Sequence, residues 1–187
     1  MMRIEIIEVA GLAGALTALR LPYGKDARSK VVFDYDWSAE IKDAWFDSSN
    51  NICIDDRDLA LIQTLIKRGD EHAKVVRGIN VWAKITAPVY FWTEAETYRA
   101  GHERLASEST MHIDCKGLSG KELQEAKAAI PMGKELTKVD MFSYQTLRRI
   151  VAQRHDHRLP EWHQFIDWVR SLPLAEELIL VGLNIED

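Results

Sequence analysis

The chain has few cysteines, few prolines and no long apolar run. Its 187 residues include two cysteines, which are too few for the disulfide framework of a small secreted domain, so we expect both to be reduced thiols. Five prolines and ten glycines exclude a collagen-like or low-complexity chain. No stretch reaches the roughly 18 uncharged apolar residues that span a bilayer, and no signal-peptide pattern opens the sequence. We therefore expect a cytoplasmic protein with no membrane partner.

Acidic and basic residues nearly balance. The 24 Lys and Arg residues against 29 Asp and Glu residues give a formal net charge of −5. Broad binding to duplex nucleic acid needs a cationic face that neutralises phosphates, so this class of partner is disfavoured, whereas a local basic pocket is compatible with the balance. A length of 187 residues with 47% hydrophobic content suits one domain with a core. We expect a single domain over residues 1–187.

Hydrophobic periodicity predicts strands and helices along most of the chain. Strands are expected at residues 4–9, 78–86 and 177–185. Helices are expected at residues 12–19, 55–68, 88–101, 119–130, 139–154 and 159–172. Residues 22–51 predict irregular structure, and residues 102–114 are polar without helical periodicity. The fold class that follows is mixed α/β (α+β), a mixed sheet of about four strands with about six helices.

Large aromatic side chains and a single cysteine have plain packing interpretations. Trp82, Trp92, Trp162 and Trp168 could stack on a base or a flavin, but large aromatics dominate cores and subunit interfaces, and we expect packing. Cys115 could be a nucleophile only if its pKa were lowered, and a buried thiol is the better interpretation.

The motifs of common phosphate loops and nucleophile elbows are absent from the sequence. It contains no G-x-x-x-x-G-K-[ST], no G-x-G-x-x-G and no G-x-S-x-G. Polar side chains instead concentrate in two stretches that apolar elements flank, residues 94–112 and 153–158. Because sites commonly lie on loops held by rigid elements, these stretches are candidate site segments.

The first of these stretches resembles flavin-dependent thymidylate synthase. That family has the signature Arg-His-Arg, seven residues, then Ser, after a strand and an Ala-Pro helix start. Residues 87–107 begin with Ala-Pro and contain Thr97-Tyr98-Arg99, seven further residues and then Ser107. A Gly-His pair of the family is matched near residues 69–72. The similarity extends over roughly residues 68–172.

Two late segments extend the resemblance. The expected helix at residues 143–154 is similar to the family's Asn-to-Arg helix, and the following LPEWHQF is similar to its Gln-Trp-Glu segment. The family forms homotetramers that hold FAD and dUMP between subunits, and it converts dUMP to dTMP with methylenetetrahydrofolate. The resemblance therefore implies a homo-oligomer that binds FAD and a dUMP-like nucleotide.

The resemblance also implies roles for individual side chains. Arg99 and His72 would face the flavin, Ser107 would contact the nucleotide phosphate, and Arg154 would lie at the uracil edge as the catalytic cation. Guanidinium and hydroxyl groups suit this chemistry, because a phosphate accepts charge-assisted hydrogen bonds and a uracil carbonyl that gains charge needs a nearby cation. The implied site therefore needs Arg99 and Arg154 to come together around one small phosphorylated molecule.

The signature is degenerate in this chain. Thr97, Tyr98 and Ser109 replace an Arg, the His and a second Arg, and Glu94 replaces a helix-side Gln in the substrate site. Loss of a charged donor from an anion site costs on the order of 1.5–3 kcal/mol. Substitute donors for the substrate are available at Arg104, His102 and Arg158. Retained synthase activity and an altered or lost activity both agree with this pattern.

Two other functions compete with the flavin enzyme. The first is a non-catalytic protein that sequesters or senses nucleotides on the same scaffold. The second is a metal-dependent hydrolase that would use His155, His157 and His163. His155 and His157 are two positions apart at a helix end, where their side chains diverge, and no carboxylate spacing completes a recognised triad. We expect no metal site.

Overall fold

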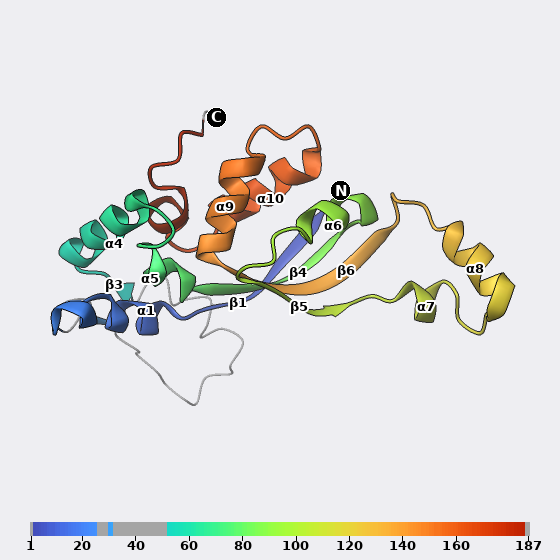
Figure 1. Cartoon of the computed structure of the whole chain (residues 1–187), viewed down its shortest axis with the longest axis horizontal. Coiled ribbons are helices and arrows are strands. Elements are labelled where there is room, and N and C mark those ends of the chain that lie inside the picture. Colours follow the sequence, from blue (N-terminus) through green and yellow to red (C-terminus); the bar gives the residue numbers. More distant parts are fainter. Residues whose placement is uncertain (1, 26–29, 32–51, 186–187) are drawn as a thin grey trace.

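The computed structural model describes residues 2–25, 30–31 and 52–185 (Figure 1). Most of the stretch 22–51, for which the sequence predicts irregular structure, lies outside the described residues. Within the described part, no helix is both long enough and apolar enough to cross a membrane.

A four-stranded sheet organises the described chain. It contains β1 (Arg3–Ala10), β4 (Asn80–Pro88), β6 (Glu135–Ser143) and β5 (His102–Ser107), in the order β1-β4-β6-β5. Every pairing in this sheet is antiparallel. A second sheet pairs the two-residue strands β2 (Lys30–Val31) and β3 (Ile52–Cys53). The prediction of an α/β fold with about four strands in its main sheet is confirmed.

Helices cover one side of the sheet and extend from its ends. They are α1 (Leu12–Leu19), η1 (Leu21–Tyr23), α4 (Asp56–Arg68), α5 (Lys74–Arg77), α6 (Val89–Ala95), α7 (Thr110–Ile113), α8 (Gly120–Ala128), α9 (Tyr144–Arg154), α10 (Pro160–Arg170) and the π-helical turn η2 (Glu176–Leu180). Figure 1 shows α6, α9 and α10 on the same side of the sheet, while α7 and α8 project beyond it.

The core lies between the sheet and these helices. β4 confirms the predicted alternation, because Val81, Ala83 and Ile85 are all fully buried on the covered face. Helix α10 contributes Trp162 and Phe165 to the same core cluster, and both are almost completely buried. Trp92 and Trp168 are also buried core residues and the Cys115 thiol is buried, as the packing interpretation predicts, whereas Trp82 is only half-buried.

Three predicted elements are wrong in type or extent. The helix expected from residue 139 begins at Tyr144, where the Ser143 side chain accepts a hydrogen bond from the Thr146 amide, and residues 135–143 form strand β6. The pattern misleads because Lys138 and Asp140 occupy inward positions, which apolar residues normally fill. The helix expected at residues 88–101 ends at Ala95.

The third error is the terminal strand expected at residues 177–185. This segment contains the π-helical turn η2, with Leu178, Ile179 and Leu180 all buried. A short, continuous apolar run does not distinguish a strand from a buried helical segment, so the sequence could not separate the two. Arg148 of α9 fixes the turn by donating hydrogen bonds to the carbonyls of Ile179 and Val181. The polar stretch at 102–107, for which no element was expected, forms strand β5.

Candidate functional site

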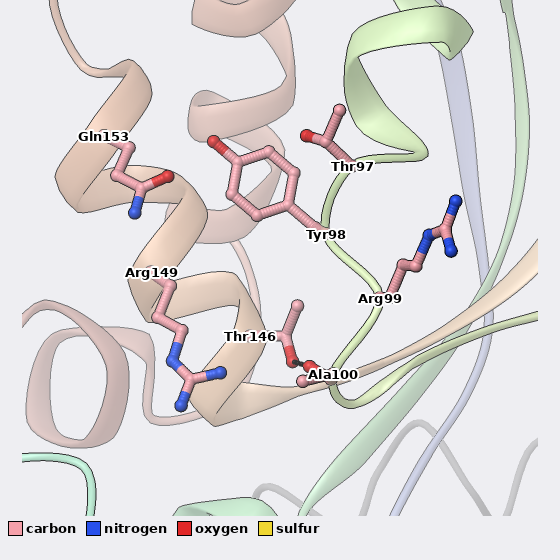
Figure 2. A pocket seen from close by; sticks show the side chains of 7 residues that line it. All are labelled: Thr97, Tyr98, Arg99, Ala100, Thr146, Arg149 and Gln153. Carbon is pink, nitrogen blue, oxygen red and sulfur yellow. Dashed lines mark hydrogen bonds between the residues drawn. The ribbon is translucent and has the colours of Figure 1, made fainter.

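A hollow of about 350 Å³ lies between the loop after α6 and one side of α9 (Figure 2). It joins the two polar stretches that the sequence singles out. The hollow is lined by Thr97, Tyr98, Arg99, Ala100, Thr146, Arg149 and Gln153. The first four of these residues stand at or next to the degenerate Arg-His-Arg signature.

Hydrogen bonds hold the loop against the start of α9. The Thr146 hydroxyl donates to the Ala100 carbonyl at 2.6 Å, and the Ser143 amide donates to the Gly101 carbonyl at 2.8 Å. Gly101 has a φ of 75°, in the left-handed region that favours glycine. A Cβ at this position would lie 2.5 Å from the hydroxyl oxygens of both Ser143 and Thr146. The loop can approach α9 this closely only because residue 101 has no side chain.

Arg154 lies at the centre of a partly buried cluster beside the hollow. Its Nε donates to the Tyr98 hydroxyl and its Nη1 to Glu94 Oε2, both at 2.9 Å. The guanidinium carbon lies 4.8 Å from the Trp162 ring centroid and 5.6 Å from that of Tyr98. The Trp162 indole also donates to Glu94 Oε2. Arg154 is therefore held in place by Glu94, Tyr98 and Trp162, and its charge is largely neutralised by Glu94.

Arg99 has a different environment from Arg154. Figure 2 shows the Tyr98 side chain turned towards α9 and the Arg99 side chain turned away from it. Arg99 is exposed, and its side chain makes no hydrogen bond or ion pair with the described residues. One chain thus brings Tyr98 and Arg154 together and leaves Arg99 available to a ligand or to a neighbouring chain.

The α9 side of the hollow contributes Thr146 and Arg149, which sequence reasoning missed, and Gln153, which opens the polar stretch 153–158. Thr146, Arg149 and Gln153 stand three and four positions apart, so they share one face of the helix. This spacing is a signal that the sequence contains. Arg149 pairs with Asp70 through its Nε, and the Gln153 side chain is directed towards the hollow (Figure 2).

A second charged cluster lies under the C-terminal end of α6. Arg104 of β5 donates to Glu96 at 2.9 Å and to Asp140 at 3.3 Å, and Lys138 donates to Glu96 at 2.7 Å. The hydrogen bond from Lys138 lowers the pKa of the Glu96 carboxyl. Burial lowers the pKa of Lys138, although Glu96 acts in the opposite direction. Arg104, a predicted substrate donor, is therefore engaged with two carboxylates.

The other predicted residues lie on the surface. His72 is exposed between α4 and α5, with Nε2 3.6 Å from Glu71. Ser107 is exposed at the end of β5, and its hydroxyl donates to the Glu108 carbonyl. Neither residue lines the hollow.

Two of the three histidines considered for a metal have other contacts, whereas Nδ1 of His155 is buried without a hydrogen-bond partner among the described residues. His157 Nδ1 accepts a hydrogen bond from the Leu159 amide, and its Nε2 lies 3.4 Å from Glu94. His163 Nε2 lies 2.7 Å from the His157 carbonyl. Among the described residues, no group of three or more His, Cys, Asp or Glu side chains could hold a metal ion.

Comparison with solved structures identifies the fold. Thymidylate Synthase X (ThyX) from Helicobacter pylori, in a crystal structure with FAD and dUMP, aligns with a TM-score of 0.65 and 13% sequence identity over 98% of this chain and all of that chain. A second structure, described as flavin-dependent thymidylate synthase ThyX from the same organism complexed with FAD and dUMP, gives 0.64 and 12% over the same shares.

A methylase with a related substrate has the same fold. The UMP/dUMP methylase PolB from Streptomyces cacaoi, bound with 5-Br dUMP, aligns with a TM-score of 0.60 and 10% identity over all of this chain and 98% of that chain. No family model and no curated protein sequence matches the chain. The fold is that of the flavin-dependent thymidylate synthases, as the resemblance in residues 68–172 implies.

Proposed function

We propose that the chain binds a dUMP-like mononucleotide at the hollow between residues 97–100 and α9. One observation carries the proposal: in a fold shared with ThyX and a UMP/dUMP methylase, the chain's hollow is lined by the loop at the position of the family's signature. Ligand pockets commonly measure about 300–1,000 Å³, so a hollow of about 350 Å³ suits a mononucleotide or a smaller molecule.

The lining residues supply the chemistry that such a nucleotide needs. Tyr98 offers an aromatic ring against which a base can stack, and Gln153 offers an amide that can both donate to and accept from a base edge. Arg99, whose side chain is turned away from α9, offers an unpaired guanidinium for a phosphate that extends past the loop. Arg154 lies behind Tyr98 and keeps its proposed place at the uracil edge, where its Nη2 makes no hydrogen bond to the described residues.

The remaining predicted residues need a second subunit to take part. His72 and Ser107 do not line the hollow of their own chain, so we propose that they contribute, with Arg104, to a site shared between chains. Binding of FAD would likewise need a second subunit. A hollow of this size does not hold a whole dinucleotide, and Thr97 and Tyr98 replace an Arg and the His of the signature. The described residues of one chain therefore do not fit FAD, and a flavin would need residues from a neighbour.

Exposed apolar side chains support self-association. The segment 108–134, which we call the arm, carries α7 and α8 beyond the sheet (Figure 1), and neither helix has a buried residue. The large hydrophobic residues exposed on it or at its base are Leu105, Met111, Ile113, Leu118 and Met132. Contiguous exposed apolar surface commonly marks an interface. We propose a homo-oligomer, with a tetramer expected from the resemblance.

The absorbance spectrum and thermal unfolding of the purified protein test the proposal and separate its versions. Flavin absorbance together with release of FAD on heating would support a thymidylate synthase-like methyltransferase. Colourless protein that dUMP stabilises against heat would support the nucleotide-sequestering or regulatory alternative. Inorganic phosphate at the same concentration is the control. If neither dUMP nor UMP at millimolar concentration raises the unfolding temperature above that control, the proposed site is wrong.

The hydrolase alternative has its own test. It requires a stoichiometric metal, and loss of that metal to a chelator would lower both activity and stability. The contacts of His157 and His163 with backbone groups do not favour it.

A further inference from the structure

Asp70 and Arg149 form a pair beside the hollow. Arg149 of α9 lines the hollow, and its Nε donates a hydrogen bond to Oδ2 of Asp70, in the loop between α4 and α5. Neither Nη1 nor Nη2 of Arg149 has a partner among the described residues, and Oδ1 of Asp70 has none there either. The pair therefore offers hydrogen-bond donors and an acceptor next to each other.

A buried glutamine fixes the pair to α9. Gln145 is only 4% exposed. Its Nε2 donates to the Asp70 carbonyl at 2.9 Å, and its Oε1 accepts from Nε of Arg77 at 3.0 Å. An exposed ion pair gains little on its own, because two long side chains must be held in one geometry. Here the backbone of Asp70 is held on the helix that carries Arg149, so the pair is preorganised. It is also accessible, because the Arg149 side chain is 36% exposed and that of Asp70 is 44% exposed.

The pair lies about one helical turn from a residue that we expect at the base. Gln153 stands four positions after Arg149, and such residues are neighbours on a helix, with Cβ atoms about 5–6 Å apart. Figure 2 shows both side chains on the side of α9 that faces the loop. In the proposed site, Gln153 and Tyr98 contact the base, and Arg99 takes a phosphate that extends past the loop. The sugar joins these two parts of a nucleotide, so we expect it beside Arg149.

The charges of the pair suit a hydroxyl better than a phosphate. Asp70 neutralises much of the charge of Arg149, and a bound phosphate would lie close to this carboxylate. A hydroxyl is both a donor and an acceptor, so it can donate to Oδ1 of Asp70 while it accepts from an Nη of Arg149. An acidic side chain that accepts from the 2′-hydroxyl of ribose is a recurring feature of dinucleotide-binding folds.

We propose that Asp70 and Arg149 read the 2′-hydroxyl of the ligand's sugar, so that the hollow prefers a ribonucleotide such as UMP to its deoxy counterpart. The inference rests on the proposed nucleotide site and names the class of its ligand. Asp70 accepts a hydrogen bond from the hydroxyl, and Arg149 donates one to the hydroxyl oxygen. Gln145 is the positioning residue that keeps the carboxylate in place. Ribose then makes a contact that deoxyribose cannot make.

Calorimetric titration of the full-length protein with UMP and with dUMP tests the inference. We expect the wild type to bind UMP about tenfold more tightly than dUMP, the effect of one hydrogen bond to a charged group. The variant Asp70→Ala removes the carboxylate and keeps the backbone carbonyl that Gln145 binds. In this variant we expect UMP affinity to fall to that of dUMP. We expect dUMP affinity to change little, because dUMP has no 2′-hydroxyl.

Glu71→Ala is the matched control. Glu71 is the next residue of the same loop, its side chain is 72% exposed, and it does not line the hollow. This variant removes the same charge, so a general electrostatic effect would appear in both variants. We expect Glu71→Ala to keep the preference for UMP. Arg149→Met removes the other half of the pair, and we expect it to lose the preference as Asp70→Ala does.

The outcomes separate this inference from the nucleotide site itself. Equal affinity of the wild type for UMP and dUMP would overturn the inference and leave the nucleotide site standing. A preference for UMP that persists in Asp70→Ala and Arg149→Met would also overturn it, and so would a loss of dUMP affinity in them as large as that of UMP. If neither nucleotide binds the wild type, the nucleotide site is wrong and the inference falls with it.

Discussion

At the residue scale, the most consequential difference from the pattern that the resemblance implies is Glu94, a carboxylate. Its Oε2 accepts from both Arg154 and Trp162, at 2.9 Å in each case. The family has a neutral Gln where this chain has Glu94, by the resemblance described above. A carboxylate in this place holds the arginine more strongly than an amide would and neutralises its charge. Arg154 is therefore less available to an anionic ligand than its position implies.

The variant Glu94→Gln tests this interpretation. It keeps the shape of the side chain and removes its charge. We expect affinity for dUMP to rise several-fold because the charge of Arg154 is released, and stability to fall by about 1 kcal/mol because one charge-assisted hydrogen bond is weakened. Calorimetric titration and chemical unfolding measure the two quantities. Unchanged dUMP affinity alongside the expected loss of stability would show that Arg154 does not face the ligand.

The pairing of Glu96 with Lys138 makes stability depend on pH. The hydrogen bond from Lys138 lowers the pKa of Glu96 in the folded state. Its contribution to stability is therefore present above the ordinary carboxyl pKa and lost as pH falls through the lowered value. Because Glu96 is 47% exposed, solvent screening limits this contribution to about 1 kcal/mol or less.

Chemical unfolding of Glu96→Gln at about pH 7 and about pH 3 measures this contribution. We expect the variant to be less stable than the wild type at the higher pH and to approach it at the lower pH. An equal difference at both values would mean that the carboxylate charge of Glu96 adds nothing. Lys138→Met removes the same hydrogen bond from its other end, and we expect it to be destabilising, because removing one partner of a buried ion pair leaves the carboxylates with one cation fewer.

At the element scale, the loop between α6 and β5 depends on a single glycine. Gly101 combines a left-handed φ of 75° with a close approach to Ser143 and Thr146 at the start of α9. Any side chain there meets both restrictions at once. Gly117 has only the first restriction, the left-handed backbone. Its φ is 83°, and a Cβ added to it would meet no described atom within 4 Å.

The variants Gly101→Ala and Gly117→Ala form a matched pair. Backbone strain alone costs about 1–2 kcal/mol, so we expect a loss of this size for Gly117→Ala. We expect a larger loss for Gly101→Ala, together with loss of dUMP-induced stabilisation, because the loop must move away from α9. Thermal unfolding with and without dUMP measures both effects. Equal losses in the two variants would mean that the close contact at Gly101 is readily relieved.

Elements whose buried positions hold apolar residues could be predicted from the sequence. Elements whose buried positions hold charged residues could not. β4 alternates apolar and polar residues, and α4 has an Asp55 cap and a basic last turn, so both are found where expected. β6 buries Lys138 and Asp140, which only their cross-strand and α6 partners make tolerable. Those partners are tertiary information, and local periodicity does not contain it.

In the candidate site, too, local sequence patterns were predictable and tertiary contacts were not. The polar stretches 94–112 and 153–158 were recognised from composition, and parts of both meet at the hollow. The restraint of Arg154 by Glu94 and Tyr98 could not be predicted, because it depends on packing between α6, α9 and α10. The roles assigned to His72, Arg99, Ser107, Arg104 and Arg154 stay predictions.

At the scale of the whole molecule, the arm buries one side chain, that of Cys115, among its described residues. Within the described residues, α7 and α8 have no buried side chain. Hydrogen bonds join both ends of the arm to the body: Glu108 bonds to Thr137, and the Val89 and Tyr90 amides donate to the carbonyls of Lys134 and Met132. We therefore propose that a partner surface covers the arm.

Charged substitutions on the arm test the proposed oligomer. We expect Met111→Lys combined with Ile113→Lys to dissociate it, because each places a charge on surface that association would bury. Leu21→Lys in η1 is the control, since Leu21 is at least as exposed as Met111 and Ile113 but lies outside the arm. Sedimentation velocity gives the mass of each species. A wild-type monomer, or a double variant with the wild-type mass, would contradict the proposal that the arm is the interface.

The central claim is that the hollow beside α9 binds a mononucleotide through Arg99. Calorimetric titration of dUMP into the wild type, Arg99→Ala and Arg68→Ala tests it most directly, because Arg68 is an exposed arginine on α4 that does not line the hollow. We expect one site per chain, affinity lowered about 10- to 100-fold in Arg99→Ala, and no change in Arg68→Ala. Absence of binding to the wild type, or equal affinity in all three proteins, would contradict the account.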